Sequence, residues 1–311
     1  MRPFRRILCP VDFSEFSVPT VALARRMADD FGAVVQVLYV ADTREFSPAI
    51  AVHDPAAAAA NRARVESHLA RFLREMSLDP EQGVIVDGIV HRSIVQQARD
   101  GEFDLVMMGT HGHSGFERLL LGSVTEKVLH KLEVPLLAVP AQAGLSASDL
   151  AGAPAFRSIM VGTDLGPETG ASVDFGLALA RRYAARLVLV HVVTPQAGVL
   201  LPPEAAMVVA TAETPILMRH QAAKDALAEL VETRRRADEE IDTLVTDGLP
   251  AATLTRVARE KEADLLIVGA HGVGRTELGW VGSTCHRVLR TSPCPVLAVR
   301  VPAPQAPARV A

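Results

Sequence analysis

Short apolar runs alternate with longer amphipathic stretches along almost the whole chain. Val34 to Val40 is a nearly continuous, valine-rich run, which is typical of a strand buried on both faces of a sheet. Residues 17–31 instead bring apolar side chains to one face at helical spacing, with Ser17 as the expected N-cap. Strands that alternate with helices in this way predict right-handed parallel crossovers and a doubly wound α/β sheet.

The same alternation runs through both halves and predicts a five-stranded parallel sheet in each. In the first half we expect strands at 7–11, 34–40, 84–86, 105–108 and 136–139, and helices at 17–31, 55–76, 93–99 and 123–131. In the second half we expect strands at 158–163, 187–193, 241–246, 265–269 and 296–300, and helices at 170–184, 214–235, 253–261 and 283–291.

The two halves are copies of one design. Residues 86–112 align with 246–272 at an offset of 160, whereas residues 9–17 align with 161–169 at an offset of 152. The second copy therefore carries eight extra residues, around PQAGVLLPPEAAMVV (195–209). That segment is either a loop packed on its own domain or a lid or partner surface.

A repeat of this size predicts a tandem duplication rather than a solenoid. We expect domains at 1–142 and 157–303, a flexible linker at 143–156, and a disordered tail at 304–311.

Composition narrows the class of protein. The 311 residues fit two domains, and 49% hydrophobic with 22% charged residues is ordinary for a soluble globular chain. A net charge of −4 gives no case for nucleic-acid binding. Cys9, Cys285 and Cys294 lack CxxC spacing, so we expect buried free thiols. No apolar stretch suits a membrane helix, and Asp12 interrupts the N-terminal apolar run too early for a signal peptide, so we expect a cytoplasmic protein.

A glycine-rich loop occurs once in each half, as GTHGHSGFERLLLGSV and GAHGVGRTELGWVGST. Each loop follows a predicted strand and ends where a predicted helix begins, which is where open α/β sheets bind ligands. Glycines let backbone amides approach an anion, and a helix N-terminus attracts one. The shared positions are Gly109, Gly112, Gly122 and Ser123 in the first half, and Gly269, Gly272, Gly282 and Ser283 in the second. The alternative is that the glycines only shape a turn and the serines only cap a helix.

No GxxxxGK[ST] occurs, and no GxGxxG follows the first strand. The segments PVDFSEFS, DLVMMGTHG and LLLGSVTEKVLHKLEVPLLAV, with VGTDLGPE, DLLIVGAHG and GSTCHRVLRTSPCPVLAV, instead resemble the universal stress protein family. The resemblance implies an α/β sandwich of five parallel strands, ATP binding where the glycine pattern is intact, and two halves arranged as an intramolecular dimer. It covers nearly the whole chain apart from linker and tail.

The resemblance also implies a role for individual residues. Asp12 and Asp164 would contact the nucleoside, and the backbone at Val40 and Val192 would contact adenine. The loop glycines, the serines, and the amides of the residues that follow them, Val124 and Thr284, would hold phosphates. For each aspartate, the alternative is a turn residue that precedes a helix.

The chain departs from the family pattern where many members carry a basic residue after the second loop glycine. His113 and Val273 stand there, so phosphate neutralisation would fall to Arg118 and Arg275. Glu117 and Glu277 are either solvated carboxylates or outer ligands of magnesium. His111 and His113 form an HxH that the second half lacks, so no metal site is expected there. Because Pro10-Val11 becomes Gly162-Thr163, we expect unequal sites, with the first half binding more tightly.

Three functions are open at this point. The first is a stress-response regulator that binds ATP, with Mg²⁺ assisting, at one site per half, and that acts on an unidentified protein partner as a homodimer. The second is an ATP hydrolase or phosphotransferase, for which no loop lysine or evident base is present, so turnover should be slow or absent. The third is a partner-binding scaffold that uses the loops only structurally.

Overall fold

The computed structural model describes residues 4–43, 55–110, 121–143, 154–166, 169–194, 213–236, 239–271 and 281–300. The first half contains β1 (Arg6–Val11), α1 (Ser17–Phe31), β2 (Val34–Asp42), α3 (Pro55–Glu75), β3 (Gly83–Gly88), α4 (Val90–Asp100), β4 (Leu105–Gly109), α5 (Ser123–Lys131) and β5 (Leu136–Val139). The second half contains β6 (Ser158–Thr163), α6 (Thr169–Tyr183), β7 (Arg186–Val193), α8 (Glu213–Glu232), β8 (Ile241–Asp247), α9 (Pro250–Glu260), β9 (Leu265–Gly269), α10 (Ser283–Thr291) and β10 (Val296–Val299).

Each half has the predicted parallel doubly wound sheet. All ten strands join in one sheet, in the order β3-β2-β1-β4-β5-β10-β9-β6-β7-β8. Within each half the chain starts in the middle strand, winds outward, and then returns to the other side. The order therefore reverses between β1 and β4, and between β6 and β9, and these are the switch points where such sheets bind ligands.

Two helices begin a full turn before their predicted starts, and one predicted N-cap is wrong. α4 begins at Val90 and α9 at Pro250, each three residues before the expected start. Proline suits the first turn of a helix because its missing N–H would have no helical partner there. Ser17 is not the N-cap of α1: the helix begins at Ser17, the cap position is Phe16, and the Ser17 hydroxyl donates to Asp12 instead.

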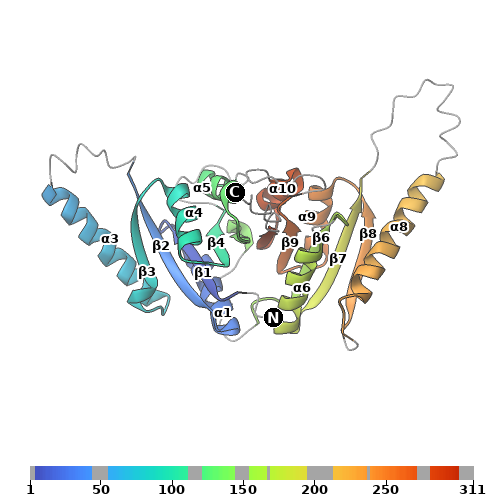
Figure 1. Cartoon of the computed structure of the whole chain (residues 1–311), viewed down its shortest axis with the longest axis horizontal. Coiled ribbons are helices and arrows are strands. Elements are labelled where there is room, and N and C mark those ends of the chain that lie inside the picture. Colours follow the sequence, from blue (N-terminus) through green and yellow to red (C-terminus); the bar gives the residue numbers. More distant parts are fainter. Residues whose placement is uncertain are drawn as a thin grey trace, which may run out of the picture.

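The two halves lie side by side (Figure 1). They meet at an antiparallel seam between β5 and β10. Leu137 lies opposite Leu297, and these two residues occupy equivalent positions in the repeat. A pseudo-twofold axis therefore passes through this pair. Because the inner strands pair with each other inside the chain, β3 and β8 are the two outer edges of the sheet.

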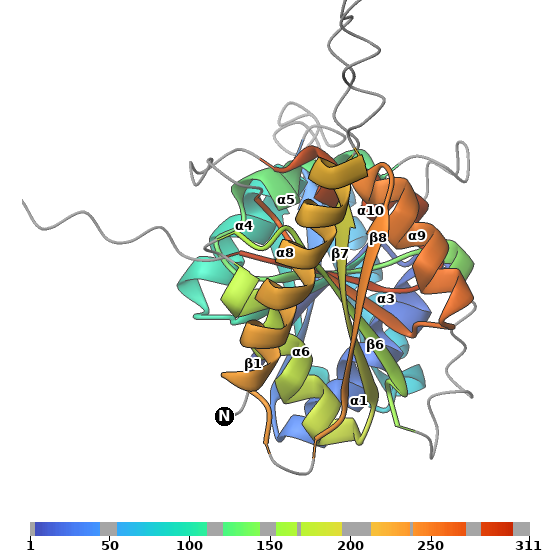
Figure 2. The same cartoon turned by 90° about the vertical axis from the view of Figure 1, so that its right-hand side faces the viewer.

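Two apolar layers run across both halves, one on each face of the sheet. The layer of Ile7, Leu105, Ile159 and Leu265 is covered by α1, α3, α6 and α8, whereas the opposite layer is covered by α4, α5, α9 and α10. α8 packs along β7 and β8, as Figure 2 shows. Burial of both faces explains why the strands are continuous apolar runs rather than alternating ones.

An aromatic cluster joins the halves at the amino ends of the strands. Phe4 packs edge-on against Phe31, and the equivalent residues Phe156 and Tyr183 repeat that contact. Phe31 and Tyr183 then meet across the axis with ring centroids 5.9 Å apart. Aromatic pairs of this kind add about 1 kcal/mol each beyond the area they bury, so the cluster stabilises the contact between the two halves.

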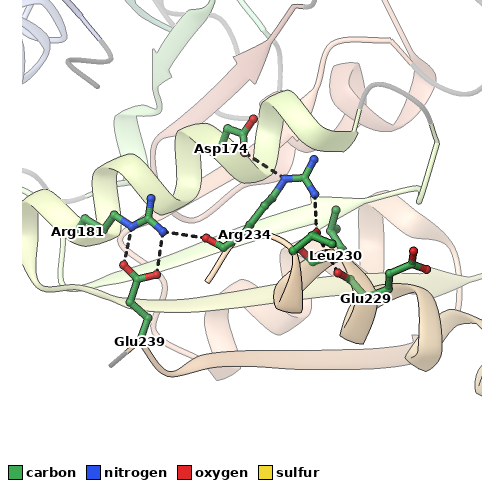
Figure 3. A network of polar contacts seen from close by, with 7 residues as sticks. Asp174, Arg181, Glu229, Leu230, Arg234 and Glu239 are labelled. Atoms are coloured by element: carbon green, nitrogen blue, oxygen red, sulfur yellow. Dashed lines mark hydrogen bonds and ion pairs between the residues drawn. The ribbon is translucent and has the colours of Figure 1, made fainter. Parts of the chain in front are cut away.

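Beside this cluster, α6 is tied to the chain that leads from α8 to β8 (Figure 3). Arg181 donates two hydrogen bonds to the Glu239 carboxylate and a third to the Arg234 carbonyl, while Arg234 donates to Asp174. The bonds from Arg181 lower the pKa of Glu239 to about 2. The cavity of about 650 Å³ next to this network is lined by four arginines. Because carboxylates of Asp174 and Glu239 already pair with these cations, we assign the network a structural role.

Candidate functional site

A cavity of about 610 Å³ lies at the carboxyl ends of the second-half strands. Six of the seven site residues predicted for this half line it: Asp164, Val192, Gly269, Gly282, Ser283 and Thr284. The seventh, Gly272, lies outside the described residues. The cavity therefore collects side chains and backbone from the ends of three strands and from the first turn of α10, at the predicted switch point.

The end of β9 and the start of α10 are held together by the backbone. The Gly282 N–H donates to the carbonyl of Ala270, and Gly282 is the N-cap of α10. A Cβ at Gly269 would lie 3.2 Å from the carbonyl oxygen of His271, so the chain is tightly turned there. The first amides of α10, at Ser283 and Thr284, have no carbonyl in their own helix to bond. They supply the positive end of the helix dipole at the cavity wall.

The first half uses the same construction. The Gly122 N–H donates to the Thr110 carbonyl, and a Cβ at Gly122 would lie only 3.0 Å from that oxygen. Thr125 in α5 donates its hydroxyl to the carbonyl of Gly109 at 2.9 Å. Ser123 and Val124 therefore open α5 beside the end of β4, as predicted. Gly112 lies outside the described residues.

The two predicted aspartates shape equivalent turns. Asp164 accepts hydrogen bonds from the Gly166 amide at 2.9 Å and from the Thr169 hydroxyl at 3.2 Å. Asp12 accepts from the Ser14 amide and the Ser17 hydroxyl, both at 3.0 Å. Both aspartates therefore stabilise the turns in which they lie, while contact with a ligand stays a prediction.

Val192 and Val40 lie near the ends of β7 and β2, and both residues are buried. Val192 lines the cavity, while contact between either backbone and adenine stays a prediction. Beside Val192, the His191 ring shares a hydrogen bond of 3.0 Å with the Thr163 carbonyl through Nδ1. If Nδ1 carries the proton, Nε2 is left as an acceptor.

The sequence prediction missed several residues of the cavity wall. Thr163, Ser172, His191, Arg219 and Cys285 all line it. His191 had a signal, because it is the one polar residue in the run LVLVHVV. Arg219 lies on the exposed side of α8, where an arginine is ordinary, and nothing in the sequence distinguishes it. Burial raises the pKa of Cys285 to about 12, so it is a neutral thiol rather than a nucleophile.

Several predictions fall on residues that the structure does not describe. These are the loop residues His111, His113, Glu117, Arg118, Val273, Arg275 and Glu277, the segment 195–209, most of the linker, and the tail.

All three cysteines are free and buried, as expected. Within the described ranges, no three His, Cys, Asp or Glu side chains are grouped so that they could bind a metal. None of the described helices has the length and hydropathy of a membrane span.

Comparison with known sequences finds relatives of both halves. The sequence profile of the universal stress protein family matches residues 3–140 and again residues 155–300. A universal stress protein of Methanocaldococcus jannaschii is 31% identical over 144 residues, 44% of this chain and 82% of that protein. A universal stress protein of Mycolicibacterium smegmatis is 26% identical over 213 residues, 68% of this chain and 66% of that protein.

Comparison with solved structures shows the same fold over the full tandem arrangement. A universal stress protein from Archaeoglobus fulgidus is 19% identical with a TM-score of 0.63, covering 95% of this chain and 98% of that chain. The family profile matches once in each half, and the two matches together cover most of the chain. The chain therefore belongs to the universal stress protein family, with two copies of its fold in tandem.

Proposed function

We propose that the chain is a regulatory protein that binds ATP, with one nucleotide site in each half. The observation that carries the proposal is the second-half cavity, which gathers the six described residues predicted to hold a nucleotide. Its volume of about 610 Å³ lies within the range of small-molecule sites, roughly 300–1,000 Å³. Family membership supports the same reading, because the chain carries the glycine pattern on which ATP binding was predicted.

The two ends of the cavity suit the two ends of a nucleotide. At one end, the α10 amides at Ser283 and Thr284 offer hydrogen-bond donors and a helix dipole to phosphate oxygens. At the other end, the Val192 backbone and the His191 ring offer polar groups among apolar walls. A base and a ribose need that combination of apolar surface and a few directed hydrogen bonds.

The cavity wall offers little for phosphoryl transfer. Its described residues include no lysine, and Asp164 is the single carboxylate among them. Oδ1 of Asp164 already accepts two hydrogen bonds within its turn, which gives this carboxylate a structural role. Magnesium would be held mainly by phosphate oxygens and water, as is usual for this ion. We therefore expect binding with at most slow hydrolysis, and an output through conformation and a protein partner.

Calorimetric titration of nucleotide-free protein tests the proposal. ATP, ADP, AMP and cAMP are titrated separately, each with and without Mg²⁺. We expect ATP to saturate at two per chain, with phosphate release far below the typical enzymatic range of about 1–1,000 per second. Failure of every nucleotide to bind would overturn the proposal. Rapid phosphate release would favour the hydrolase instead.

A further inference from the structure

Arg300 is a buried cation at the seam between the halves. It directly follows β10, and its side chain is only 5% exposed. The equivalent position of the first half is Pro140, so only the second half has this guanidinium. Arginine is almost never buried without partners that offset the loss of hydration, and its surroundings therefore need an explanation.

The guanidinium reaches from one half to the other. Its Nη2 donates to the Leu129 carbonyl near the end of α5 in the first half. Its Nη1 lies 3.4 Å from Nε2 of His271, which lines the second-half cavity directly after β9. A guanidinium can only donate, so Nε2 must accept. His271 is then a neutral imidazole whose proton sits on Nδ1.

This arrangement is costly if its only purpose is stability. Among the described residues, no carboxylate lies within 4.0 Å of Arg300, and its Nε has no hydrogen-bond partner. Glu133, the carboxylate whose charge reaches it, pairs with Arg99 instead. Burial lowers the pKa of Arg300. A buried, incompletely paired cation destabilises a fold relative to an apolar side chain, which favours a role in the neighbouring site.

We propose that Arg300 is the positioning residue of the second-half nucleotide site. It holds His271 as a neutral ring with a donor on Nδ1, and it places a fixed positive charge behind the cavity wall formed by His271 and Cys285. This inference rests on the proposed function, since the anion to be held is the nucleotide phosphate. A positive charge shielded from water acts on a nearby anion more strongly than an exposed one.

The hydrogen bond from Arg300 to the Leu129 carbonyl makes the second-half site depend on both halves. Because that bond ends on α5, the cavity wall of the second half is anchored on the helix that opens the first-half site. The second-half site is therefore complete only when the halves are assembled. Pro140 gives the first-half site no such anchor.

Nucleotide titration of Arg300 variants tests the affinity. Gly122→Glu is introduced first, to silence the first-half site and leave the second to be measured alone. In that background we expect Arg300→Met to weaken ATP binding about tenfold or more, as loss of a hydrogen bond to a charged group does. Arg300→Lys should restore part of the affinity, because it keeps the charge but not both hydrogen bonds. Arg287→Met, an exposed arginine on α10, is the matched control and should bind like the parent.

Nitrogen NMR of the imidazoles gives a readout that a purely structural role would not move. In the parent protein, the His271 signals, assigned by their loss in His271→Gln, should show a neutral ring protonated on Nδ1. In Arg300→Met that preference should disappear. An Nε2-protonated ring or an imidazolium in the parent would overturn the inference, as would unchanged affinity in Arg300→Met. If the parent binds no nucleotide, the proposed function and this inference both fail, whereas normal binding with an unaffected Arg300→Met contradicts the inference alone.

Discussion

The two halves share a backbone but carry complementary polar side chains where they meet. Asp30 and Arg182 are equivalent positions in the repeat, and Arg182 contacts Asp30 across the axis, with Nη2 3.7 Å from Oδ1. Glu126 and His286 are equivalent as well, and they lie 3.1 Å apart. In a dimer of identical subunits each of these residues would face its own copy. Duplication within one chain allows the two copies to become complementary.

The halves also differ at the end of the site predicted for the nucleoside. In the first half, the Phe13 ring stacks between Tyr39 and His68, at centroid distances of 4.8 and 4.3 Å. In the second half, the residues equivalent to Phe13 and Tyr39 are Leu165 and His191, and both line the cavity. The backbone is the same at both turns, with φ of +60° at Phe13 and +57° at Leu165. The difference is therefore one of side chains, and it predicts two sites that recognise the base differently.

The largest expected effect is a loss of stability at the β5–β10 seam, where the two halves contribute equivalent residues. Leu137 and Leu297 lie opposite each other on the axis, and each is 1% exposed. Leu137→Ala and Leu297→Ala should each lower the free energy of unfolding by about 3 kcal/mol, the usual cost of a buried leucine. Denaturant titration followed by circular dichroism measures this. Losses below about 1 kcal/mol would mean that the seam between β5 and β10 does not form in solution.

The next effect tests whether each glycine loop serves its own half. Gly122→Glu and Gly282→Glu each place a carboxylate at a helix end that attracts anions. At Gly122 the added Cβ would also lie 3.0 Å from the Thr110 carbonyl oxygen. Each should weaken ATP binding in its own half about a hundredfold, which is close to 3 kcal/mol, and reduce the stoichiometry from two to one.

Ala59→Glu, which adds the same charge on the exposed side of α3, is the control and should keep two sites. If both loop variants also keep two sites, the loops are structural and the nucleotide binds elsewhere.

A smaller loss of stability is expected when the complementary pair at the axis is disrupted. Arg182→Asp would set two carboxylates against each other at Asp30, whose side chain is only 13% exposed and also accepts from Arg26. We expect a loss of about 1–2 kcal/mol, between the values for exposed and buried pairs. Asp30→Arg combined with Arg182→Asp reverses the pair and should recover part of the loss in a thermal melt. No recovery in the double variant would show that the pair itself contributes nothing.

The sequence predicted the fold well because periodicity and repetition reinforce each other. The valine-rich runs could only be strands buried on both faces, and the copy at a fixed offset repeated every element. Helix starts were less certain, because the first turns of α4 and α9 are half exposed and interrupt the apolar pattern. No local sequence pattern predicts the seam between β5 and β10, because the residues of a strand do not show with which distant strand it pairs.

For the candidate site, backbone-dependent residues were easier to find than side-chain contacts. Glycines at strand and helix ends indicate a turn, and two of them, Gly269 and Gly282, line the cavity. Arg300 and Arg219 were missed because their relevance depends on residues brought near by the fold. Arg300 lies beside His271 and Leu129, which are distant in sequence. Charged residues that act across a domain interface cannot be recognised from spacing alone.

The smallest expected effect tests the difference between the nucleoside ends. Leu165→Phe gives the second half the residue found at the equivalent turn of the first, and a ring at this position would enter space that now belongs to the cavity. With the first-half site silenced by Gly122→Glu, we expect ATP affinity to change about fivefold, in line with the ~1 kcal/mol of an aromatic contact. Inorganic triphosphate, which lacks a base, should bind the two proteins equally. An equal change for ATP and triphosphate would place residue 165 at the phosphate end, and would contradict the orientation proposed here for the nucleotide.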